Sequence, residues 1–329
     1  MSPEQAAARF LRSYATPDGR VVRLDQGHDT VSEGQAYGML LAEINGDHAQ
    51  FRRIWQLTRD HLQLPDGLFA WYTDAAGQVV GLDPASDADL LIAWALLRYR
   101  GPGAATLHQD GRRVAAGILA NEVITGPGGM RVLIAGPWAN GSPATVNPSY
   151  WSLTAFHGLE QLTGSNEWHR LAVSAVRLTR ELTHGGRTLP PDWAQLSADG
   201  TVRPVAAPDG SEPGAVYGPG AQRTVVWFAA SCDPLARSLA AHWWRLLRPG
   251  HRSLLLTLRL GGGMVDPSHA ALPLVASAAA AISAGDRAVA TSLLQRAQAQ
   301  QRILPTYYGG AWVALGPALL TPGGALSTC

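Results

Sequence analysis

The chain has 329 residues, and its 26 Lys and Arg nearly balance its 25 Asp and Glu, giving a formal net charge of +1. This length can bury a large core, either as one large domain or as two smaller ones. This near-neutral net charge gives no indication of a basic surface that would bind nucleic acid or an anionic membrane. No run of about 18 apolar residues is present, so the sequence predicts no membrane span.

Hydrophobic periodicity predicts about a dozen helices, mostly in consecutive pairs. Before position 100 we expect helices over 3–14, 36–44, 47–63 and 90–99, an extended piece over 19–24, and a hairpin over 68–80. Further along we expect helices over 106–121, 147–163, 166–183, 220–231, 234–247, 268–283, 286–300 and 308–320, with loops and a hairpin over 184–219.

Paired helices of similar length can pack as αα-hairpins and close into a ring with one open end. The long, irregular loops mostly fall before the first helix of a pair, so we expect them to gather at one end of the ring, where a site would form. No strongly polar linker divides the helices. The sequence therefore predicts an all-α fold, as a single domain over 1–329, with small β-hairpins in the loops.

The segment 32–39, S-E-G-Q-A-Y-G-M, places one carboxylate, Glu33, at a predicted loop-to-helix junction. Ser32 is the predicted N-cap, and an acidic residue in the first turn interacts favourably with the helix dipole. These two structural roles alone would explain why Ser32 and Glu33 occur here. Gly34 and Gly38 each cost about 1 kcal/mol in a helix relative to Ala. Close approach of another group to the backbone explains them better, and a sugar ring is our candidate.

Two further acidic segments are candidates for chemistry. Asp87 and Asp89 lie at the start of a predicted helix. An aspartate at this position is about as often a helix cap or a partner of the helix dipole as it is a catalytic or binding residue. Asp192, in P-P-D-W, is more often an ordinary turn residue. Two carboxyl groups in different environments are what glycoside hydrolysis requires, because one donates a proton to the leaving oxygen and the other activates water or attacks.

Other kinds of site have little support in the sequence. No H-x-x-x-H or C-x-x-C spacing is present, and we expect neither a metal nor a cofactor. The glycines at 261–263 lack the following Lys-Ser/Thr of a phosphate loop, and no G-x-S-x-G is present for an acyl hydrolase. Residues 1–5 do not form a signal peptide. Whether Cys232 and Cys329 pair is left open.

Four segments together resemble glycoside hydrolase family 8. They are 32–39, 85–96 (A-S-D-A-D-L-L-I-A-W-A-L), 147–150 (N-P-S-Y) and 191–193 (P-D-W), in that family's order and roughly its spacing. Leu-Phe-Ala-Trp at 68–71 resembles an element of the endo-β-1,4-glucanases associated with bacterial cellulose synthesis. The resemblance implies an (α/α)6 barrel with an open cleft, which hydrolyses β-1,4-linked glycans with inversion.

By position, the resemblance implies roles for individual residues. Glu33 matches the general acid, and Asp87 matches the aspartate that grips the distorted sugar at the cleavage subsite. Tyr150 matches a tyrosine near the attacking water, and Arg223 matches an arginine beside the general base. The aromatic residues that match sugar-contacting positions are Trp71, Tyr72 and Tyr308.

The base itself departs from the family pattern. Most of the family carries an aspartate in Y-D-A-x-R, but here the segment 217–223 is Y-G-P-G-A-Q-R, so Gly220 holds that position. Some branches of the family lack this aspartate and use an acidic residue from elsewhere, commonly an inserted loop. Asp209 and Glu212 are candidate bases of this kind, and the alternative is that both belong to a plain solvated turn. A smaller departure is R-Y-R at 98–100, where a small residue is usual.

Two hypotheses of different class follow. The first is an active inverting endo-glycanase with a relocated base, acting on a cellulose-like β-1,4-glucan or on mixed-linkage glucan, xylan or chitosan. The second is a catalytically weak or inactive glycan-binding relative with a role in exopolysaccharide assembly. The retained Glu33, Asp87 and Tyr150 favour the enzyme, because a binding-only protein has no need of a proton donor. Gly220 favours the alternative.

The expected partner is a β-glycan polysaccharide or oligosaccharide, with no nucleic acid. A monomer is the expected state for an endo-acting enzyme with an open cleft. Because such a polymer lies outside the cytoplasm, the expected location is secreted, extracellular or periplasmic.

Overall fold

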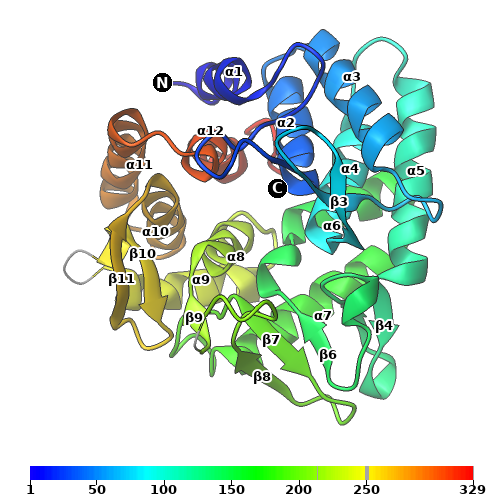
Figure 1. Cartoon of the computed structure of the whole chain (residues 1–329). Coiled ribbons are helices and arrows are strands. Elements are labelled where there is room, and N and C mark those ends of the chain that lie inside the picture. Colours follow the sequence, from blue (N-terminus) through cyan, green and yellow to red (C-terminus); the bar gives the residue numbers. More distant parts are fainter. Residues whose placement is uncertain (213, 249–251, 329) are drawn as a thin grey trace.

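In the computed structural model, which describes residues 1–212, 214–248 and 252–328, helices form a double ring (Figure 1). The inner ring contains α2 (Ser32–Ile44), α4 (Ser86–Arg98), α6 (Leu153–Thr163), α8 (Pro219–Ala229), α10 (Ala271–Ser283) and α12 (Tyr307–Leu320). Each inner helix packs on the next, and α12 packs on α2, so the ring is complete.

The outer ring contains α1 (Pro3–Tyr14), α3 (His48–Leu57), α5 (Ala104–Asn121), α7 (Glu167–Leu182), α9 (Pro234–Leu247) and α11 (Arg287–Ile303). Each outer helix packs on the inner helix next to it in the chain, and α1 packs on both α2 and α12. The described residues therefore contain six inner and six outer helices. This arrangement confirms the predicted (α/α)6 architecture.

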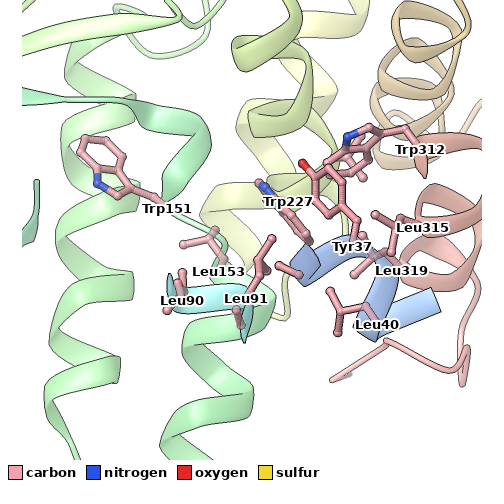
Figure 2. Packing of buried hydrophobic residues seen from close by; sticks show 14 of the residues in the cluster. Tyr37, Leu40, Leu90, Leu91, Trp151, Leu153, Trp227, Trp312, Leu315 and Leu319 are labelled. Carbon is pink, nitrogen blue, oxygen red and sulfur yellow. The ribbon is translucent and has the colours of Figure 1, made fainter. Parts of the chain in front are cut away.

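The core lies between the inner helices, which are apolar on nearly all sides. In α4, for example, every residue from Ser86 to Leu97 is buried. A helix that is apolar all round requires burial on all sides, whereas the outer helices carry one apolar face. Near the centre of the ring, the indole of Trp312 makes edge-on contacts with Tyr37 at 5.8 Å and Trp227 at 5.2 Å between ring centroids (Figure 2).

Short antiparallel strands fill the connections that lead into the inner helices. One sheet has the order β1-β2-β3, in which Val31 pairs with Tyr72, and another has the order β6-β7-β8. These strands are β1 (Thr30–Val31), β2 (Ala70–Thr73), β3 (Val79–Pro84), β6 (Ala144–Val146), β7 (Trp193–Leu196) and β8 (Val202–Val205). The remaining strands are β4 (Val123–Thr125), β5 (Arg131–Leu133), β9 (Val216–Tyr217), β10 (Leu255–Arg259) and β11 (Met264–His269).

Helices α2 and α4 begin four residues earlier than the predicted ranges 36–44 and 90–99, and Glu33 and Asp87 lie in their first turns. The predicted N-cap role of Ser32 is wrong. The N-cap position is Val31, which makes no side-chain capping bond, because the chain passes directly from the paired strand β1 into the helix.

The predicted helices over 47–63 and 147–163 are each interrupted. The first becomes α3 and then a π-helical turn over 58–62. At the start of this turn, the buried hydroxyl of Thr58 donates to the Ile54 carbonyl at 2.7 Å and accepts from Nε2 of Gln35 at 2.9 Å. The second begins as a 3-10 turn over 148–150, and α6 follows with Ser152 as its cap. The hairpin β10–β11 was not predicted.

Two further points complete the fold. None of the helices in the described ranges combines the length and apolar character needed to cross a membrane. The pairing of Cys232 with Cys329, which the sequence left open, involves a residue outside the described ranges.

Candidate active site

A buried cluster around Arg223 forms where the first turns of the inner helices meet. Glu33 comes from α2, Asp87 from α4 and Arg223 from α8, so residues far apart in the sequence converge. Nη1 of Arg223 donates hydrogen bonds to Oε1 of Glu33 and, at 2.9 Å, to Oδ2 of Asp87. Nη2 donates to Oγ of Ser149 at 2.7 Å. One guanidinium therefore joins two carboxyl groups of the predicted site.

Two tyrosines hold the carboxyl group of Glu33 in place. The hydroxyl of Tyr308, from α12, lies 2.8 Å from each carboxyl oxygen. The hydroxyl of Tyr37, one turn further along α2, donates to Oε1 at 2.9 Å. Burial raises the pKa of both tyrosines well above the ordinary value, so they remain neutral donors. These bonds fix the direction in which Glu33 presents its oxygens.

The charges of the cluster are set by burial and by mutual interaction. Burial raises the pKa of Asp87 to about 7, with a further increase from the charge of Glu33 and an opposing effect from Arg223. Asp87 and Glu33 contact the same guanidinium nitrogen. Because its pKa is about 7, Asp87 changes its protonation state near neutral pH.

An aromatic cavity of about 400 Å³ lies beside the cluster. The ring of Tyr150 lines it and also faces Arg223, whose Cζ is 5.7 Å from the ring centroid. Flat apolar faces with polar edges suit the faces of sugar rings. The other side chains that line the cavity are Trp71, Asp83, Pro84, Ala85, Trp138, Trp193, Pro208 and Asp209.

The indole of Trp71 can lie at this cavity because the neighbouring residue on β3 is a glycine. The tryptophan, 40% exposed, lies against Gly81 of the neighbouring strand β3, where any Cβ would collide with the indole. Tyr72 stacks on Trp71 at 4.8 Å between ring centroids. The lining of this cavity includes Trp71 but not Tyr72, which touches the cavity only through its stacking on Trp71 in the described residues.

Asp89 does not join the cluster. Its Oδ1 accepts the backbone N–H of Phe69 at 2.9 Å, so it ties the start of β2 to α4. Its carboxyl group lies beside that of Glu122, and burial raises the pKa of both well above the ordinary range. Burial therefore favours the neutral form of each of the two carboxyl groups. Of the D-A-D pair, Asp87 alone reaches Arg223.

The prediction that Gly34 and Gly38 make room for a sugar is wrong. Both are buried and face protein side chains. A Cβ at Gly34 would stand 2.8 Å from the hydroxyl of Tyr307, and one at Gly38 would stand 2.6 Å from a methyl group of Val21. The glycines allow α12 and the N-terminal segment to pack closely on α2.

Three other carboxylates lie on the segments that precede α8. Asp192 is buried against Gly218 and Gly220, and burial raises its pKa to about 6. Asp209 lies in an exposed turn at the cavity, where its hydrogen bond to Ser211 lowers its pKa. Glu212 is half-buried, and burial with the charges of Asp192 and Asp209 raises its pKa to about 7.

Several site residues were not singled out from the sequence. Ser149 and Tyr37 lie within recognised motifs, but nothing local indicated that they bond to Arg223 and Glu33. Trp193 follows Asp192 directly in P-D-W, and Trp138 is one of only a few exposed tryptophans. The sequence contains 11 Trp against 5 Phe, an excess that could have indicated such platforms, although most of these tryptophans fill the core.

Comparison with known proteins gives consistent matches. A sequence profile described as glycosyl hydrolases family 8 matches residues 3–210. An endoglucanase of Cellulomonas uda is 31% identical over 213 residues, which are 61% of this chain and 58% of that protein. Endoglucanase A of Acetivibrio thermocellus is 29% identical over 299 residues, which are 86% of this chain and 59% of that protein. The chain thus spans about six-tenths of the length of these curated relatives.

Solved structures share the fold. The family 8 endoglucanase Cel10 of Klebsiella pneumoniae has a TM-score of 0.78 at 26% identity, covering 95% of this chain and 97% of that one. A β-1,3-1,4-glucanase of Paenibacillus sp. X4 has a TM-score of 0.84 at 19% identity, covering 97% and 90%, which is a likeness of fold. Since the profile matches more than half of the chain, the protein belongs to the glycosyl hydrolases of family 8.

Proposed function

We propose that the chain is an endo-acting glycoside hydrolase that cleaves β-1,4-linked, cellulose-like glucan with inversion at the anomeric carbon. The observation that carries this proposal is the buried group of Glu33, Asp87 and Arg223 beside an aromatic cavity. The endoglucanases to which the chain is similar support the substrate class.

Glu33 is the proposed general acid. It gives its proton to the glycosidic oxygen as the bond from that oxygen to the anomeric carbon breaks. Tyr37 and Tyr308 keep its carboxyl group oriented through the reaction. Asp87 accepts a hydrogen bond from a sugar hydroxyl, and this bond strengthens as the ring acquires oxocarbenium character. Trp71 and Tyr150 hold neighbouring sugar rings.

The water that attacks the opposite face of the sugar requires a second carboxylate. In inverting glycosidases the two carboxyl groups are about 6.5–9.5 Å apart, which leaves room for that water. With Gly220 at the family's usual position, the candidates are Asp192, Asp209 and Glu212, all on segments that precede α8. Gly220 also supports the alternative function, a weak or inactive glycan-binding relative in exopolysaccharide assembly.

The proposed setting follows from the substrate. Because a β-glucan polymer lies outside the cytoplasm, we place the protein in a secreted, extracellular or periplasmic location. An open cleft needs no second subunit to complete it, so we propose that the chain acts as a monomer.

The test is hydrolysis of a panel of soluble β-glycans: carboxymethyl cellulose, mixed-linkage glucan, xylan and chitosan. We expect new reducing ends with the β-1,4-glucan and a rapid fall in its viscosity, which marks internal cleavage. Proton NMR of the first products from a cello-oligosaccharide should show the α-anomer. A β-anomer would contradict inversion. If the chain binds a β-glycan but hydrolyses none of the four polymers, the result would support the alternative function, a glycan-binding relative.

We expect Trp71→Ala to raise KM for carboxymethyl cellulose about 2- to 10-fold while kcat changes less than about twofold. An aromatic contact of this kind contributes about 0.5–1.5 kcal/mol. Among the described residues, the hydrogen bonds that hold Glu33 come from Tyr37, Tyr308 and Arg223 rather than from Trp71. Gly81→Val should give a similar KM, because its side chain displaces the indole. The matched control is Val80→Ala on the same strand, whose exposed side chain lies outside the cavity lining. Equal KM values for all three variants would contradict the role of Trp71.

We expect kcat/KM to fall as pH decreases from about 7 to about 5. Asp87 accepts a hydrogen bond from the sugar hydroxyl best in its ionised form, and burial raises the pKa of Asp87 to about 7, so the ionised fraction decreases about tenfold per pH unit well below that value. Measurement of kcat/KM from pH 5 to 9 on a neutral cello-oligosaccharide checks this. A kcat/KM that stays constant from pH 7 to pH 5 would show that the ionisation of Asp87 takes no part in the reaction.

A further inference from the structure

The carboxylate of Asp192 caps helix α8 from a separate loop. Its Oδ1 accepts the backbone N–H of Gly218 at 3.0 Å and of Ala221 at 2.5 Å. The first N–H groups of a helix have no acceptor within the helix, so an external carboxylate satisfies them and interacts favourably with the helix dipole. The position of Asp192 is thus fixed by the same helix that carries Arg223.

Two glycines make the space that this carboxylate occupies. A Cβ at Gly220 would lie 3.2 Å from Oδ1 of Asp192 and 3.6 Å from Oγ of Ser149. A Cβ at Gly218 would overlap Oδ2 of Asp192. Position 220 is where the family resemblance implies the missing base. The carboxylate of Asp192 therefore stands directly beside the place from which an aspartate at 220 would project.

The surroundings of Asp192 suit a group that takes a proton from water. Both hydrogen bonds from α8 end on Oδ1, which leaves Oδ2 for a water molecule. Burial raises the pKa to about 6, while the backbone N–H groups and Arg223 oppose that effect, so the group is ionised at neutral pH and still basic. The next residue, Trp193, lines the aromatic cavity.

We propose that Asp192 is the general base of this chain and replaces the aspartate that Gly220 lacks. The proposal rests on the function proposed above. As the water oxygen bonds to the anomeric carbon, Oδ2 of Asp192 takes one of its protons. The bond from the anomeric carbon to the leaving oxygen breaks, and that oxygen takes the proton of Glu33. Asp192 ends protonated and Glu33 ionised, and solvent restores both.

The two loop carboxylates are less suited to the role. Oδ1 of Asp209 accepts the backbone N–H of Ser211 at 3.0 Å in an exposed turn, which lowers its basicity. Glu212 lies near Asp192 and Asp209, and their charges favour its protonated form. The space at Gly220 borders both Oδ1 of Asp192 and Oγ of Ser149, and that hydroxyl accepts a hydrogen bond from Nη2 of Arg223. These contacts connect Asp192, through Ser149, with the arginine that holds Glu33 and Asp87.

The first experiment compares Asp192→Asn with Asp209→Asn and Glu212→Gln. The amide oxygen of Asn keeps an acceptor for the N–H groups of α8, so the cap survives while the base is lost. We expect kcat on a cello-oligosaccharide to fall about 10²- to 10⁴-fold for Asp192→Asn, with the oligosaccharide Kd within about threefold of wild type. The loss of kcat for each of the two loop variants should be at least about tenfold smaller than the loss for Asp192→Asn. The matched control is Asp199→Asn, in the exposed turn between β7 and β8 and outside the cavity lining, which should keep kcat within about threefold. Thermal unfolding of each variant monitors the fold.

The second experiment separates a base from a purely structural cap. Azide carries no proton to remove, so it can attack the anomeric carbon without a base. With Asp192→Ala, added sodium azide should restore turnover and yield an α-glycosyl azide, identified by NMR. If this variant does not fold, Asp192→Asn with azide provides the same readout. A structural cap alone predicts no azide-dependent product.

The outcomes separate the two proposals. If the wild type cleaves β-glucan and Asp192→Asn retains kcat within tenfold, the base assignment is overturned and the proposed function stands. The same holds if Glu212→Gln or Asp209→Asn gives the large loss and the glycosyl azide. A wild-type chain that cleaves none of the β-glycans overturns the function and this inference together.

Discussion

Glu33→Gln should lower kcat on cello-oligosaccharides about 10²- to 10⁴-fold, the range that general acid catalysis contributes. The amide has nearly the shape of the carboxyl group and can still accept hydrogen bonds from Tyr308 and Arg223, so substrate Kd should change little. It cannot, however, supply a proton to the leaving oxygen.

An activated substrate makes this prediction specific to proton donation. A 2,4-dinitrophenyl β-cellooligosaccharide has a leaving group that departs without protonation, so the loss in kcat should shrink to less than about tenfold. The matched control is Glu181→Gln, since Glu181 is exposed and pairs only with Arg177, at 3.0 Å, among the described residues. Equal losses on both substrates would argue that Glu33 has another role.

Arg223→Met should reduce the free energy of unfolding by about 3–5 kcal/mol at pH 8, the usual cost of removing one partner from a buried ion pair. The variant keeps the volume of the side chain but leaves Glu33 and Asp87 close together with no counter-charge. Hydrolysis should also be lost, because Arg223 holds both carboxyl groups and Ser149 in place.

The destabilisation by Arg223→Met should be smaller at pH 5 than at pH 8. Asp87 already has a folded-state pKa of about 7, above the usual value, and removal of Arg223 raises it further. A carboxyl group with a raised pKa weakens the fold progressively as pH rises above its unfolded-state value, because the unfolded chain ionises first. At pH 5 the group is protonated in the fold and the missing charge matters less.

Urea unfolding of Arg223→Met and wild type at both pH values measures this difference. Arg113→Met is the matched control, since Arg113 forms an exposed pair with Asp110 at 2.8 Å. Such surface pairs contribute about 0–1 kcal/mol. A loss for Arg223→Met below about 1 kcal/mol, or one equal at the two pH values, would contradict the bridging role of the arginine.

Local patterns predicted the helical pairs well because each helix carries its own signals. The helix over 3–14 was predicted with its observed bounds, and in the structure Ser2 caps it and Pro3 lies in its first turn. Errors of about four residues occurred at the starts of α2 and α4. There the chain enters the helix from a strand, so strand pairing and burial, rather than a capping side chain, decide where the helix begins.

The glycines of the S-E-G-Q-A-Y-G-M segment illustrate what a sequence leaves undecided. A glycine in a helix indicates that something approaches closely, but it does not identify the approaching group. Here the groups are Tyr307 for Gly34 and Val21 for Gly38, both from elements distant in sequence. Similarly, the P-D-W segment indicated an ordinary turn, whereas its aspartate caps α8.

By itself, the sequence predicted the alternation of helices, and its resemblance to the family identified Glu33, Asp87 and Arg223 as site candidates. Only the tertiary structure decided that one guanidinium joins two carboxyl groups that lie 190 and 136 residues from it in the chain. It also decided that the carboxylate of Asp192 lies beside Gly220. The physical reason is that these contacts depend on which first turns meet when the ring closes, and ring closure is a property of the packed core rather than of any local segment.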